Sequence, residues 1–251
     1  MPNLVNFKTV PTDVPLSAEN VDRIAARAAE LATAFKTRID KLQATFAEAR
    51  DRYSREADTI VAEAGPEHRA TAKQFAKQQE ASKIAKYRIT LAESSRPQRE
   101  EVLRPLAKLA ADAEFLLTLN QSPAQALCRV ALGDPRRTHY LQQLETAGDV
   151  ELTTAAVTAI ATNDLPLAAA VATICDRRPS SRRPFAVGEF AERVWGRQHA
   201  EVVTKLKGAI LAHKTAVAAD AEFVRGRGDS ITNLSLQLAQ RAIDQATGTE
   251  A

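Results

Sequence analysis

The chain contains few of the residues that build disulfide frameworks, β-strands or membrane spans. Its 251 residues include two cysteines, Cys128 and Cys175, and neither lies at zinc-ligand spacing from another Cys or from a His. No window approaches the roughly 18 consecutive apolar residues of a membrane span, and the N-terminal residues lack a signal-peptide pattern. We therefore expect reduced thiols, no membrane partner, and a location in the cytoplasm or in a virus particle rather than secretion.

Motifs of nucleophilic catalysis, phosphate binding and metal binding are also missing from the sequence. There is no nucleophile elbow, P-loop or dinucleotide-binding glycine pattern. His199 and His213 share a helix face but lie about 21 Å apart at 1.5 Å per residue, so they cannot bind one metal ion. The two cysteines fall on apolar faces, which favours buried packing over a reactive thiol. The sequence predicts no catalytic, cofactor-binding or metal-binding residue, and a protein that is not an enzyme.

Alanine dominates what is present, with 48 residues, whereas aromatic residues make up only 5%. Alanine is the best helix former, and β-branched and aromatic residues, which favour strands, are sparse. This composition predicts an all-α protein: a long antiparallel helical hairpin with coiled-coil-like packing, a bundle of short helices and a C-terminal helical pair. The expected divisions are an extended arm (1–16), the hairpin (17–120), the short-helix bundle (121–176), a basic loop (177–186) and the C-terminal pair (187–251).

The hairpin is predicted from one long uninterrupted pattern. Ser17 is a suitable N-cap, and no Gly or Pro follows before Gly65-Pro66, where a tight reversal is expected. In the returning arm, the Pro97 region is expected to break or kink the helix, and Pro105 requires a later start or a second kink. The apolar stripe of the first helix advances in steps of three and four residues, through Val21, Ile24, Ala28, Leu31, Phe35, Ile39, Leu42, Phe46, Ala49, Tyr53, Ala57, Ile60 and Ala64.

After residue 120, residues that favour the start of a helix occur more often along the chain. Four cap-like starts at Ser122, Asp134, Asp149 and Asp164 predict four short helices, two of which share a small-residue face. A long helix is then expected from Gly188 to about Arg225. The final helix follows Asp229, and its apolar face is formed by Ile231, Leu234, Leu238 and Ile243.

Two segments are candidate interaction sites. The first is the N-terminal arm, in which Leu4, Val5, Phe7 and Val10 alternate with polar residues among three prolines. So much apolar surface on an extended segment must pack against something. Both docking on the chain's own helices and docking on a neighbouring subunit fit the pattern.

The second candidate is the basic loop, where Arg177, Arg178, Arg182 and Arg183 lie within seven residues and the prolines and serines disfavour regular structure. Three interpretations remain open. The guanidinium groups can pair with local acids such as Asp176 and Glu189, bind an acidic protein surface, or bind nucleic acid. The last is disfavoured because Phe185 is the only aromatic residue nearby for base stacking.

These features favour a non-enzymatic structural or interaction protein, a helical subunit of a larger assembly whose partners are other protein subunits or further copies of itself. The chain has 23 Arg against 11 Lys, which with the alanine excess indicates a GC-rich coding sequence, and a bacteriophage particle is the specific setting that we favour. The alternative is a nucleic-acid-associated or regulatory helical protein of a bacterium.

Overall fold

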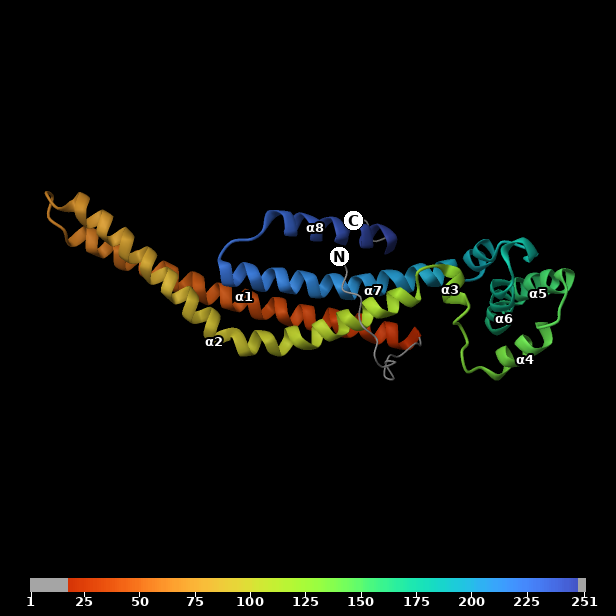
Figure 1. Ribbon diagram of the computed structural model, residues 1–251. Coiled ribbons are helices and arrows are strands. Elements are labelled where there is room, and N and C mark those ends of the chain that lie inside the picture. The colour runs from red at the N-terminus through yellow and green to blue at the C-terminus, as the bar shows by residue number, and fades with distance from the viewer. Residues whose placement is uncertain (1–17, 248–251) are drawn as a thin grey trace. The chain divides into compact units, whose positions relative to one another are not determined.

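The computed structural model describes residues 18–247, which are almost entirely helical and contain no strand (Figure 1). The all-α prediction is therefore confirmed. The elements within this range are α1 (Ala18–Glu63), α2 (Arg69–Leu119), α3 (Pro123–Leu127), α4 (Pro135–Leu144), α5 (Asp149–Thr162), α6 (Leu165–Arg177), the single 3-10 turn η1 (Ser180–Arg182), α7 (Val187–Arg225) and α8 (Ser230–Thr247).

The chain divides into two compact units, each with its own core. We call residues 23–111 and 208–244 the long-helix unit, and the described parts of 1–22, 112–207 and 245–251 the short-helix unit. The helices α1, α2, α7 and α8 contribute residues to both units. Each unit is described separately below.

The predicted stripe of α1 forms one side of the core of the long-helix unit. Ile24, Phe35 and Ile39 are at most 3% exposed, and the other stripe members in this unit are buried or half-buried. A helix of 46 residues gains most of its stability from such packing rather than from intrinsic propensity. The spacing of apolar residues therefore identified the buried face of α1 correctly.

The long hairpin is also confirmed, because α1 and α2 lie antiparallel and side by side (Figure 1). The ring of Tyr87 on α2 lies 6.4 Å from that of Phe46 and 6.1 Å from that of Tyr53, both on α1. The chain reverses at Gly65-Pro66 as predicted, although Gly65 is not in the left-handed conformation and α2 begins only at Arg69.

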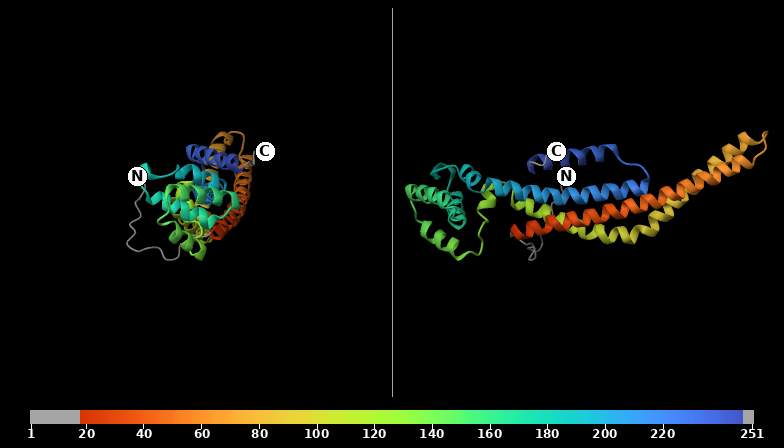
Figure 2. Two further views of the ribbon diagram at one scale, coloured as in Figure 1. Left: turned by 90° about the vertical axis from the view of Figure 1, so that its right-hand side faces the viewer. Right: turned by 180° about the vertical axis from the view of Figure 1, so that it is seen from behind.

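Of the two outcomes expected at Pro97, a break or a kink, the break does not occur. A single helix, α2, runs through Pro97 and Pro105, although it changes direction along its length (Figures 1 and 2). Proline removes one backbone donor and crowds the preceding turn. Near Pro97, side chains supply additional donors to backbone carbonyls: the Ser95 hydroxyl donates to Leu91 O at 2.6 Å, and Arg99 Nη2 donates to Ala92 O at 2.7 Å. These bonds stabilise the helix where the backbone ladder is interrupted.

Arg99 is the main polar residue in the core of the long-helix unit, and it is only 4% exposed. Its guanidinium donates to the Asp220 carboxylate on α7, and it lies 5.4 Å from the ring centroid of Phe223. The sequence contains a signal for this position, because Arg99 falls on the stripe that continues to Val102 and Leu106. A charged residue on an apolar stripe requires a buried partner.

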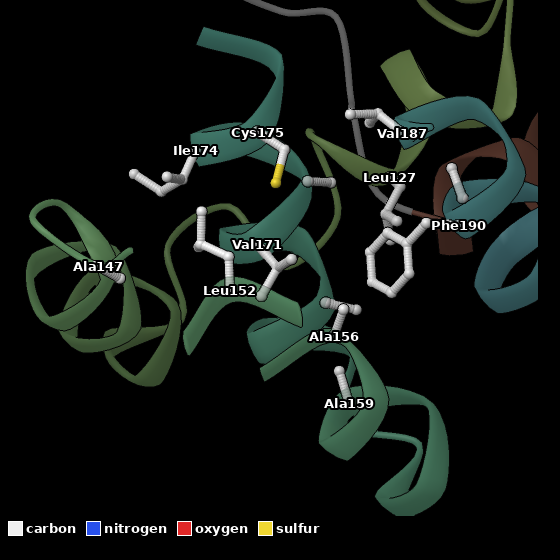
Figure 3. Packing of buried hydrophobic residues seen from close by; sticks show 13 residues of the cluster. Leu127, Ala147, Leu152, Ala156, Ala159, Val171, Ile174, Cys175, Val187 and Phe190 are labelled. Atoms are coloured by element: carbon white, nitrogen blue, oxygen red, sulfur yellow. The ribbon is translucent and has the colours of Figure 1, made fainter. Parts of the chain in front are cut away.

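The core of the short-helix unit is centred on α6, whose residues 168–172 are all fully buried. Helices α3, α4 and α5 all contact α6. Figure 3 shows the side chains of this core, which include Leu152 of α5, Val171 and Cys175 of α6 and Phe190 of α7. A helix that is apolar on every side must lie at the centre of its neighbours.

Three of the four predicted caps of the short helices are confirmed. Ser122, Asp134 and Asp164 are N-caps whose side chains accept backbone N–H bonds from the first turn of α3, α4 and α6. The fourth is wrong by one residue, since Gly148 is the N-cap of α5 and Asp149 is its first helical residue. The Gly148 N–H instead donates to the Glu151 carboxylate at 2.7 Å.

The helix α7 ends at Arg225 and α8 follows Asp229, as predicted, and α7 begins at Val187, one residue before the expected Gly188. Gly226 ends α7 with a φ of +76°, and its N–H donates to Glu222 O at 2.8 Å, a conformation in which glycine has no steric cost. Asp229 caps α8 by accepting the Ile231 N–H at 3.1 Å. Hydrogen bonds from Thr232 and Ile231 lower the pKa of the Asp229 carboxyl.

We expect Phe35→Asp to lower the free energy of unfolding by about 3–5 kcal/mol, because it places an unpaired carboxylate in a site that is 1% exposed. Thermal and urea unfolding followed by circular dichroism measure the change. Ala34→Asp is the matched control, because Ala34 is exposed. Equal unfolding midpoints for the two variants would show that the α1 stripe faces solvent.

We expect Asp220→Ala to destabilise the protein by about 3 kcal/mol, because it leaves the Arg99 guanidinium buried without its carboxylate. The double variant Arg99→Met/Asp220→Leu removes both charges and is expected to recover most of that loss. Urea unfolding of the three proteins forms the test. A double variant as unstable as Asp220→Ala would show that the packing of these side chains, rather than charge pairing, is what stabilises the site.

Candidate interaction site

The four arginines of the basic loop fall into two classes in the structure. Arg177 is the last residue of α6 and Arg182 lies in η1, and both side chains are exposed. Arg178 and Arg183 are half-buried. The loop thus contains one 3-10 turn where no regular structure was expected, since the Arg182 N–H donates to Pro179 O at 2.8 Å.

Arg178 connects the loop to the start of α5. Its Nη1 donates to the Asp149 carboxylate at 2.9 Å, and its Nη2 donates to the Ala147 carbonyl oxygen. Both acceptors flank the N-cap Gly148 of α5. One guanidinium therefore fixes the loop to the turn between α4 and α5.

Arg183 folds the loop back onto the end of α6. Its Nε donates to Arg178 O at 3.0 Å, and its Nη2 donates to Asp176 O at 3.0 Å and lies 3.3 Å from the Asp176 carboxylate. Asp176 is one of the local acids that the sequence suggested, whereas Asp149 is a partner that it did not suggest. Carbonyls at the end of a helix have no backbone partner, so arginine donors are effective there.

This arrangement leaves two exposed guanidinium groups, those of Arg177 and Arg182, to meet a partner. Arg178 and Arg183 already have acceptors within the short-helix unit. The predicted arm residues Leu4, Val5, Phe7 and Val10 lie outside the described residues.

Of the four residues predicted to form the apolar face of α8, three are exposed, whereas the fourth, Ile243, is half-buried and does not share their face. Ile231, Leu234 and Leu238 are 79%, 58% and 56% exposed, while Leu236 and Ile243 on the other side of the helix are half-buried. The residues Ile231, Leu234 and Leu238 are spaced i, i+3 and i+7, so they form a continuous stripe on one face, which we call the α8 stripe. The sequence pattern identified these residues and could not distinguish an internal from an external contact.

Two of the histidines form hydrogen bonds within the protein, and both cysteines are at least half-buried. His199 Nε2 lies 2.9 Å from the Asn120 carbonyl oxygen, and His139 Nε2 lies 2.9 Å from the Gln143 amide. Burial raises the pKa of both the Cys128 and the Cys175 thiols. Among residues 18–247, no three His, Cys, Asp or Glu side chains are grouped closely enough to hold a metal ion.

Over the same described range, none of the helices combines the length and the apolar character needed to cross a membrane.

Comparison with known proteins gives no relative from which a function can be transferred. No family model matches the chain, and neither a curated protein nor a solved structure matches it.

The two classes of arginine lead to a direct prediction. We expect Arg178→Gln/Arg183→Gln to lower the free energy of unfolding by about 1–2 kcal/mol, because it removes the hydrogen bonds that two half-buried guanidinium groups donate. Arg177→Gln/Arg182→Gln removes the same charge from exposed positions and is expected to leave stability unchanged within about 0.5 kcal/mol. Thermal unfolding compares the two, and equal effects would show that all four arginines have equivalent surroundings.

Proposed function

We propose that the chain is a non-enzymatic structural or interaction protein, a helical subunit that assembles with other protein subunits. The α8 stripe is the observation that supports this proposal most strongly. Three large aliphatic side chains share one exposed helix face, and contiguous apolar surface of this kind is typical of protein–protein contacts. A second copy of the chain is the first partner to test.

The strength of such a contact follows from the size of the side chains. Burying one leucine or isoleucine contributes about 1.5–3 kcal/mol. Three of them on one helix therefore supply enough free energy to anchor a specific interface, provided that the partner offers an apolar groove or a second helix.

The exposed arginines of the basic loop favour an acidic protein surface over nucleic acid. Binding to phosphates requires several free cations along the backbone, and two of the four guanidiniums in this loop have intramolecular acceptors. Within the class of assembly subunits, a bacteriophage particle is the setting that we propose. A nucleic-acid-associated or regulatory protein is the second candidate, and strong retention on duplex DNA at physiological salt would promote it.

We expect the unmodified protein to associate in a concentration-dependent manner and Leu234→Asp/Leu238→Asp to weaken that association by at least about a hundredfold. The reason is that two carboxylates would be buried at the interface without partners. Mass photometry and sedimentation velocity measure the association.

Gln237→Asp is the matched control, because it adds a charge to the exposed surface of α8 beside the stripe rather than on it. Circular dichroism establishes that all variants keep their helix content. An unmodified protein that stays monomeric at every accessible concentration would exclude self-association through α8, and an effect of Gln237→Asp as large as that of the double variant would exclude the stripe.

A further inference from the structure

An apolar cavity in the short-helix unit begins beside the N-terminal end of α1. Its volume is about 420 Å³, which lies within the range of ligand-binding cavities in proteins. Val21 of α1 and Leu116 of α2 form its buried floor, and Val130 and Trp195 form half-buried walls. We call this cavity, with its rim residue Leu132, the α1 groove.

The rim of the groove has a strained backbone. Ala131 has a φ of +56° and Gly133 a φ of +88°. The left-handed conformation costs an alanine about 1 kcal/mol. Leu132 lies between these two residues and is 55% exposed. The turn therefore presents a leucine at the edge of an apolar cavity instead of burying it.

The polar side chains that line the groove already have acceptors within the protein. Asn120 Nδ2 donates to Leu116 O at 2.8 Å, and the Arg129 guanidinium donates to Leu119 O. The groove surface that is left for a bound segment is therefore mainly aliphatic and aromatic. This surface suits an apolar segment of polypeptide better than a charged ligand.

Seventeen residues precede Ala18, and they join α1 only one helical turn before Val21 in the wall of the groove. An extended chain covers about 3.3 Å per residue, so Phe7 can reach any part of the groove from Ala18. The segment contains Leu4, Val5, Phe7 and Val10 and carries one Lys and one Asp. Its composition matches the apolar surface that the groove offers.

We propose that residues 4–16 of the same chain dock in the α1 groove and cover Trp195 and Leu132. The covalent connection gives this segment an effective concentration on the order of millimolar, which favours docking within one chain over docking between copies. This inference is independent of the function proposed for α8, since it concerns another unit and another surface.

Trp195 is the only tryptophan of the chain, so its fluorescence reports on the groove directly. In the full-length protein we expect Phe7→Asp to shift the emission of Trp195 to longer wavelength and at least to double its quenching constant with acrylamide. Leu132→Asp, on the groove side, is expected to give the same change. Thr9→Asp is the matched control and is expected to behave as the unmodified protein.

Two outcomes would overturn the proposal. Equal quenching of Trp195 in the Phe7→Asp and Thr9→Asp variants would show that the arm does not cover the groove. Shielding of Trp195 that appears only as the protein concentration rises, together with dimers in sedimentation velocity, would show that the arm of a second copy is the occupant. Shielding that is independent of concentration supports docking within one chain.

Discussion

The burial of the apolar stripe of α1 is the constraint on which the long-helix unit depends. A helix of 46 residues is only marginally stable in water by propensity alone, and it persists because other helices cover its stripe. The stripe advances in steps of three and four residues, which keeps Ile24, Phe35 and Ile39 on one side of a nearly straight helix. The covering helices must be comparably long, and this is why α2 continues through two prolines instead of stopping at either.

The ion pair of buried Arg99 and half-buried Asp220 adds specificity to a core in which most side chains are apolar. Alanine-rich helices can slide past one another at little cost, because their surfaces have few distinctive shapes. A single charged pair between α2 and α7 penalises every register in which the guanidinium lacks its carboxylate. Because Arg99 also binds Ala92 O and Ser95 next to Pro97, one side chain stabilises the distorted part of α2 and selects its alignment with α7.

Most of the fold followed from the sequence because its signals are local. The stripe of α1, the caps at Ser122, Asp134 and Asp164 and the glycine after α7 depend on neighbours within a few residues. The sequence left alternatives open where tertiary contacts decide. Pro97 is a helix breaker in isolation, yet side-chain donors and packing keep α2 continuous. The face of α8 has a clear apolar pattern, but periodicity cannot tell whether Leu234 meets the same chain or another one.

The basic loop illustrates the same limit for a candidate site. Four arginines in seven residues suggest a polyanionic partner when only charge is counted. In an alanine-rich helical protein, however, helix ends present many carbonyls without backbone partners, and few polar side chains compete to bind them. Arg129 and Arg183 donate to such carbonyls at Leu119 and Asp176. In this loop, therefore, part of the arginine content supplies donors within the protein, and the guanidinium groups that remain exposed after folding, those of Arg177 and Arg182, are the ones that bear on the choice of partner.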